Sequence, residues 1–179
     1  MSFRLIGDRA IMRLTYPFIQ EQMPIELNRI RIAPEEKDPY GRTLTVGYLP
    51  EISYYERAKV NNVPAMPSLE WYPYDEGYDE TLKCFGESAK KQATFLARMR
   101  CRAHNAVDAE FVIDCLCSAF EQIVVNNPDN WSINSVNVNT IQWGGWVVND
   151  VKKGVLYQSS TELLAGALVQ VRMFFRQEK

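Results

Sequence analysis

The sequence is poor in the residues that carry most enzyme chemistry, because its 179 residues include a single histidine, His104. No G-x-S-x-G nucleophile motif accompanies it, and the phosphate-binding patterns G-x-x-x-x-G-K-S/T and G-x-G-x-x-G do not occur. A histidine that precedes Asn105 at a strand-to-helix junction is more often a surface or capping residue than a general base. We therefore expect no catalytic residue and no nucleotide-binding loop.

Metal-binding motifs are also missing. The cysteines form no C-x-x-C pair, and Cys115 and Cys117 are two positions apart in an expected helix, where side chains point about 200° apart. Cys101 and Cys115 fall on expected buried faces, so we predict small core residues in a reducing compartment, with Cys84 or Cys117 as exposed thiols. Acidic residues gather in loops without calcium-loop spacing, so neither a metal nor a cofactor is expected. These residues are Glu35, Glu36, Asp38, Asp75, Glu76, Asp79 and Glu80.

No apolar run approaches the roughly 18 residues that a membrane-spanning helix needs, so no membrane segment is expected. Charges interrupt the N-terminal stretch MSFRLIGDRAIMRL, which therefore lacks the apolar core of a secretory signal and is expected to be the mature start of a cytosol-made protein. The net charge is −2 and the pI is about 5.5. This balance argues against a broad basic surface for nucleic acid, while local arginine clusters remain an open alternative.

What the sequence does contain is a strand that leads directly into an amphipathic helix, between Ala93 and Val125. From Ala93 to Ala103 an apolar residue occupies every second position, the pattern of a strand with one buried face. Asn105 stands three residues before Asp108 and is the expected helix N-cap. Apolar residues then recur at helical spacing until an Asn-Asn-Pro sequence ends the pattern. The strand and the helix are expected to pack on each other.

The residues before this unit predict a helix, an edge strand and a long arm. Residues 6–21 have helical spacing, and Pro17 predicts that this helix is broken. Residues 23–32, MPIELNRIRI, alternate with one slip at Asn28, which predicts a bulged edge strand. The proline-rich stretch 33–67 has no sustained period and is expected to form an extended loop or arm that lies on a neighbour.

Further strands are expected on both sides of the central unit. SLEWYPY (68–74) predicts a strand, and 75–92 predicts a hairpin-like connection. VNVNTIQW (136–143) predicts a third strand, GGWVVNDVKKGV (144–155) predicts turns, and GALVQVRMFF (166–175) predicts an interior closing strand. The chain is therefore expected to be one α+β domain over residues 1–179, with a largely antiparallel sheet and the long helix on one face.

Two sets of residues are candidates for contacts with partners. Arg98, Arg100 and Arg102 share one face of the expected strand, which predicts either a solvated sheet face or, in a ring, a lined channel or a contact with an acidic partner. Aromatic residues of the kind that anchor protein interfaces form the second set, with core packing as the alternative. These are Trp143, Trp146, Tyr54 and Tyr55.

The order of these features resembles one family of proteins. The strand SLEWYPY, an alternating strand ending near the helix VDAEFVIDCLCSAFEQI, a tryptophan-bearing segment and a final strand resemble tail-terminator, or tail-completion, proteins of long-tailed bacteriophages. The resemblance covers residues 68–179 by layout. It implies a protein without enzymatic activity that forms a ring, typically a hexamer, on the last ring of the tail tube protein and meets the neck or head connector proteins with its other face. It also implies a virion protein assembled in the host cytoplasm, with DNA passing through the ring without sequence-specific binding.

Two alternatives stay open from the sequence. One is another neck component, such as a head-completion or stopper protein. The other is a small host-side enzyme or nucleic-acid-binding module that uses His104 and the arginine row.

Overall fold

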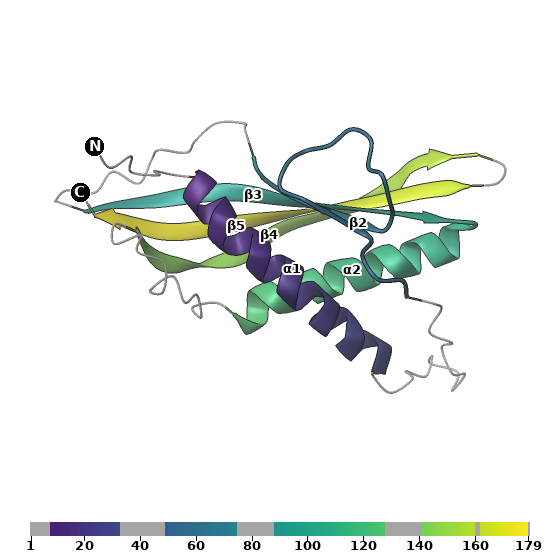
Figure 1. The fold of residues 1–179 in the computed structure, drawn as a ribbon, viewed down its shortest axis with the longest axis horizontal. Helices are drawn as coiled ribbons and strands as arrows, with labels where there is room; N and C mark the ends of the chain where they lie inside the picture. The colour runs from purple at the N-terminus through teal and green to yellow at the C-terminus, as the bar shows by residue number, and fades with distance from the viewer. Residues whose placement is uncertain (1–7, 33–48, 75–87, 128–140, 160–161, 179) are drawn as a thin grey trace.

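The computed structural model describes residues 8–32, 49–74, 88–127, 141–159 and 162–178. Within these residues the chain forms two helices and a five-stranded, mostly antiparallel sheet, which confirms the expected α+β fold (Figure 1). The elements in chain order are α1 (Asp8–Ile32), β1 (Tyr54–Glu56), β2 (Ser68–Pro73), β3 (Ser88–Ala103), α2 (Ala106–Asn126), β4 (Ile141–Gln158) and β5 (Leu163–Glu178).

The strands are ordered β1-β2-β3-β5-β4 across the sheet. β1 pairs with β2 in parallel, and every other neighbouring pair is antiparallel. β5 therefore lies between β3 and β4, which confirms the interior position expected for the closing strand. The helices pack on the face that carries Trp71, Ala97 and Val169, three residues aligned across β2, β3 and β5. We call the opposite side the open face, and the 57–67 loop lies over part of it (Figure 1).

The core is built from the expected strand and helix. Phe95 of β3 stacks on Trp71 at a ring distance of 5.2 Å, and Phe120 of α2 lies 5.7 Å from the same indole. Such aromatic contacts add to the free energy gained by burying the rings. Asn105 caps α2 as predicted, since its Oδ1 accepts a hydrogen bond from the Asp108 amide at 2.8 Å.

The N-terminal helix differs from the prediction. α1 runs unbroken to Ile32 with Pro17 and Pro24 inside it, so the expected break and the edge strand over 23–32 are both wrong. Ile19, Met23 and Leu27 recur every four residues and are fully buried against the core. Burial of this stripe offsets the hydrogen bonds that the prolines cannot donate.

β4 is longer than predicted. The expected turns over 144–155 are wrong, because the strand continues to Gln158 and the chain reverses only after it, where Ser159 N–H donates to Glu162 O at 2.8 Å. The glycine pair marks a bulge instead: the register shifts between Trp143 and Gly145, and Gly145 has a φ of 107°. Residues 136–140 of the predicted third strand lie outside the described residues.

β3 also begins earlier than predicted, at Ser88, so residues 88–92 belong to a strand and not to the hairpin-like connection. The rest of that connection, 75–87, lies outside the described residues. Within the expected 33–67 arm, residues 54–56 form β1 and residues 57–67 fold over the chain's own sheet. Residues 33–48 lie outside the described part.

More of the cysteines are buried than the sequence predicted. Cys101 and Cys115 are buried, as expected. Cys117 is buried as well, so its expected exposure is wrong, whereas Cys84 lies outside the described residues. Burial raises the pKa of the Cys101 thiol to about 11 and that of the Cys117 thiol to about 12.

In the described part of the chain, neither helix combines the length and apolar character needed to cross a lipid bilayer.

Candidate functional site

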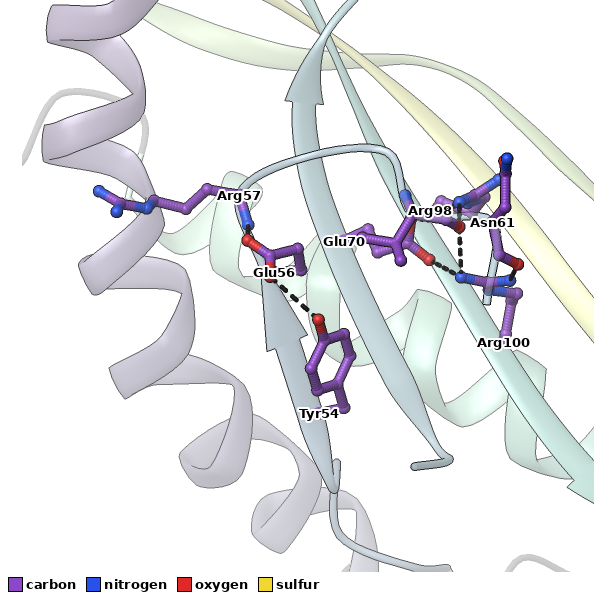
Figure 2. Close-up of polar contacts among 8 residues, drawn as sticks. Tyr54, Glu56, Arg57, Asn61, Glu70, Arg98 and Arg100 are labelled. Carbon is purple, nitrogen blue, oxygen red and sulfur yellow. Dashed lines mark hydrogen bonds and ion pairs between the residues drawn. The ribbon is translucent and has the colours of Figure 1, made fainter. Parts of the chain in front are cut away.

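Glu70, a fully buried residue on the open face of β2, is at the centre of the largest ion-paired group among the described residues. The β2–β3 register sets Glu70 opposite Arg98 and Ser68 opposite Arg100. The carboxylate therefore reaches both arginines: Oε2 accepts from Arg98, including its Nε at 3.1 Å, and Oε1 accepts from Arg100 (Figure 2). We call Glu70, Arg98 and Arg100 the Glu70 cluster.

The Glu70 cluster holds the 57–67 loop on the sheet. The Val60 amide donates to Glu70 Oε2 at 2.9 Å, and the Val60 carbonyl accepts from both arginines, at 2.9 Å from Arg100 Nη2. Asn61 O accepts from Arg100 Nη1 at 3.0 Å (Figure 2). Because charge-assisted hydrogen bonds are stronger than neutral ones, this set fixes a loop that is about 40 positions away from β3 in sequence.

These contacts correct the expected solvated face of β3. The Arg100 side chain is only 7% exposed and that of Arg98 is 20% exposed, because the loop covers them. Arg102 alone fits the expectation, since its side chain is 59% exposed and lies 3.7 Å from Glu162. The three arginines therefore do not form one continuous surface.

The Glu70 cluster carries more positive than negative charge. One carboxylate faces two guanidinium groups, which leaves an excess of one positive charge beneath the loop. Backbone carbonyls of Val60 and Asn61 offset part of that excess. Within the described part of the chain, Arg100 Nε and Ser68 Oγ are buried without a hydrogen-bond partner.

The two tyrosines singled out from the sequence lie on β1, the strand next to β2 at the edge of the sheet. Tyr54 is half-buried on the open-face side of β1, and its hydroxyl donates to Glu56 Oε2 at 2.9 Å (Figure 2). This hydrogen bond raises the pKa of Tyr54. Tyr55 points to the other side and packs against the core, where burial raises its pKa to about 12.

The two tryptophans do not form a common surface among the described side chains. Trp146 is buried: its Nε1 donates to Asn127 O at 3.0 Å, just after α2, and its ring lies 6.3 Å from Phe18. This position matches core packing, the alternative drawn from the sequence. Trp143 pairs with Phe175 in the β4–β5 ladder, and its side chain lies outside the described part.

The surface with the strongest signature of association is the β4 edge. β4 has one neighbour, β5, among the described strands, and it ends the sheet over 18 residues. Four large apolar side chains of this strand are between 47% and 60% exposed. We call them the β4 edge patch: Val147, Val155, Leu156 and Tyr157.

The sequence patterns missed both Glu70 and the β4 edge patch. Glu70 has a weak signal, because it is the one charged residue in the strand SLEWYP. The patch was missed because the glycine pair 144–145, the two lysines and Gly154 suggested turns. His104, in contrast, is exposed at the β3–α2 junction, where it was expected.

No cluster of histidine, cysteine or carboxylate residues suited to a metal ion occurs among the described residues. Comparison with known proteins gives no further guide, because no protein-family model and no curated protein matches this chain significantly.

Proposed function

We propose that this chain is a structural protein of a long-tailed bacteriophage virion, which forms a ring that caps the tail tube and joins the tail to the neck. Each subunit supplies an α+β domain, and the ring is typically hexameric. The subunits assemble in the host cytoplasm, contact the tail tube protein on one face and the neck or head connector proteins on the other, and let DNA pass through the ring.

The observation that carries this proposal is the β4 edge. A long edge strand with exposed apolar side chains is a template for pairing with another chain, and monomeric proteins usually protect such edges with charges, prolines or bulges. β4 has three register shifts, the last of them between Val155 and Tyr157, and charged residues in its middle. Val155, Leu156 and Tyr157 nevertheless stay more than half exposed. A neighbouring subunit that covers this stretch would remove apolar surface from water.

The two ends of the sheet also support a ring. One end is the three-residue β1 and the other is the 18-residue β4, so the two edges differ in length and in the side chains they carry. Contacts between two different surfaces of identical subunits are heterologous, and they close into a ring when the rotation per subunit divides a full turn.

The internal use of the Glu70 cluster is consistent with an assembly role. The hydrogen bonds of its charged groups hold the 57–67 loop on the sheet, which is a structural role. The proposed family is based on the resemblance in the order of elements between residues 68 and 179. The exposed β4 edge gives a physical reason for assembly.

The test is the oligomeric state of the purified protein and its action on tail tubes. Mass photometry and negative-stain electron microscopy should show closed rings, and added protein should stop the lengthening of tubes formed by the tail tube protein of the same phage. Val155→Lys should shift the population toward monomers. Val125→Lys is the matched control, because Val125 is also an exposed valine but lies at the end of α2, outside the β4 edge patch.

The proposal fails if the wild-type protein stays monomeric at all concentrations and binds DNA with steep salt dependence, which would favour the nucleic-acid-binding alternative. Rings that form but do not act on tail tubes would instead favour another neck component.

A further inference from the structure

A groove of about 390 Å³ crosses the open face beside the Glu70 cluster. Residues from β2, β3, β4, β5 and the 57–67 loop line it, among them Lys59, Tyr72, Arg98, Lys152, Leu156 and Leu168. We propose that this groove binds an extended acidic peptide segment of a partner protein, with carboxylates on the cations and apolar side chains on the leucines. The groove shares Leu156 with the β4 edge patch, but all of its walls come from one subunit.

The cations of the groove are incompletely neutralised. Glu70 is shared between Arg98 and Arg100, so the cluster keeps an excess positive charge at the groove wall. Lys59 is exposed and has no ion pair or hydrogen bond with the described residues. Lys152 has one acidic neighbour, Asp150, at 3.6 Å, and this pair is largely exposed and therefore weak.

Arg98 still has a donor to offer to a ligand. Its Nε and Nη2 bind Glu70 and Val60 O, whereas Nη1 makes no hydrogen bond within the described part of the chain. Glu70 holds the guanidinium in place, so a carboxylate that binds there meets a donor that is already oriented. A hollow lined by fixed positive charge also concentrates the field that attracts an acidic segment.

The apolar residues that line the groove favour an anionic ligand that also carries aliphatic groups. Leu156 packs directly over Gly166, Leu168 lies beside it on the same face, and the Tyr72 ring lies 6.0 Å from the Arg98 guanidinium. These walls suit aliphatic side chains. An extended peptide presents its side chains alternately to either side, so acidic and apolar groups of one segment can meet the cations and the leucines.

A nucleic acid fits this groove less well. Its affinity comes mainly from many phosphate contacts, whereas four cationic residues line the groove and one of them, Lys153, is paired with Asp114. The whole chain also carries a net charge of −2. Single-stranded DNA is therefore the competing ligand that the test must separate from a peptide.

The probe is a fluorescein-labelled hexapeptide amide of alternating glutamate and leucine, followed by fluorescence anisotropy with the full-length protein. We expect saturable binding that weakens as salt is added, because exposed charges contribute. Lys59→Glu combined with Lys152→Glu should weaken binding by about tenfold or more, since two attractive contacts become repulsive. Both positions are exposed, so the fold should persist, which circular dichroism checks.

Arg172→Glu is the matched control. Arg172 is exposed on the open face of β5, four positions beyond Leu168, and it does not line the groove. It should leave the affinity within about twofold of the wild-type value, because at this distance salt screens most of its effect. A second probe, in which serine replaces leucine, should bind more weakly than the leucine peptide.

Three results would overturn the proposal: no binding of the glutamate-leucine peptide by the wild-type protein, equal binding of a lysine-leucine peptide, or equal losses in the groove variant and in Arg172→Glu. Tighter binding of an oligothymidine than of the peptide would overturn it in favour of single-stranded DNA.

Discussion

The Trp71 indole donates a hydrogen bond from Nε1 to the Thr15 hydroxyl oxygen at 2.8 Å, and this bond joins β2 to α1 across 56 positions of sequence. Both side chains are buried. The contact fixes the indole N–H of Trp71 to α1, the helix whose extent the sequence patterns predicted incorrectly. A buried tryptophan usually needs such a partner, because its N–H has no water to bind.

Thr15→Val should therefore destabilise the protein by about 1–3 kcal/mol, since the change keeps the shape and leaves the indole N–H unpaired. Urea unfolding followed by tryptophan fluorescence measures this loss. Thr15→Ser, which keeps the hydroxyl, should recover more than half of it. Equal stability of the wild-type protein and Thr15→Val would show that the hydrogen bond contributes nothing to folding.

The parts of the fold that were predicted from sequence are those that local patterns determine. The alternation from Ala93 to Ala103 and the cap at Asn105 depend on neighbouring residues, and both are present in the structure. The end of α1 was missed because Ile25, Leu27, Ile30 and Ile32 fit a period of two almost as well as a helix. Contact with α2 and β2 decides between them, and that contact lies far away in sequence.

The candidate site was harder to predict for the same reason. The row of arginines was visible, but their burial depends on Val60 and Asn61, which lie 38 and 39 positions from Arg98 and Arg100 in a stretch without periodicity. A loop that covers charged residues does not change the alternation of polar and apolar residues in the strand beneath it, so this alternation cannot reveal the loop.

Glu70→Gln tests this buried arrangement. Among the described residues, the change removes the one carboxylate that pairs with Arg98 and Arg100, and breaking a buried ion pair in this way should cost about 3–5 kcal/mol of unfolding free energy. The 57–67 loop should also be cut faster by trypsin after Arg57 and Lys59, because the amide replaces one of the two acceptor oxygens of Glu70 with a donor that faces Arg100 or faces Arg98 and the Val60 amide.

Glu162→Gln is the control for that experiment. Glu162 lies 3.7 Å from Arg102 and both side chains are at least half exposed, so its loss should cost less than about 1 kcal/mol. Similar losses for the two variants in urea titrations would contradict the structural role of Glu70.

The stability of the protein should fall at alkaline pH because of Cys117. Burial raises the pKa of this thiol from 9.0 to about 12, so above pH 9.0 the unfolded chain releases a proton that the folded chain keeps. Stability is therefore fully present below pH 9.0 and is lost as the pH rises towards 12. This one thiol contributes a slope of up to about 1.4 kcal/mol per pH unit.

Cys117→Ala isolates that contribution. The variant should be less stable near neutral pH, because a buried group is removed, yet its stability should fall less steeply between about pH 9 and pH 10.5. Urea unfolding at several pH values measures both slopes. Parallel curves for the two proteins would mean that the Cys117 thiol ionises equally in the folded and unfolded states.

Gly166 and Gly154 face each other across β5 and β4 but should respond differently to alanine. A Cβ at Gly166 would lie 2.7 Å from Leu156 Cδ1 and 3.0 Å from the Met99 carbonyl oxygen, whereas a Cβ at Gly154 would meet nothing within 4 Å. Gly166→Ala should therefore cost about 1–3 kcal/mol through overpacking. Gly154→Ala should be neutral or stabilise by up to about 1 kcal/mol, since it restricts the unfolded chain.

The double variant Gly166→Ala with Leu156→Ala separates the two contacts. Leu156 is an exposed side chain that can be shortened at little cost, whereas the Met99 carbonyl belongs to the central strand and cannot move away. If Leu156 is the main obstacle, its removal should restore at least half of the stability lost in Gly166→Ala, as measured by a double-mutant cycle in urea. Additive losses would assign the cost to the backbone of β3, and the close fit of β3 against β5 would then explain the glycine at position 166.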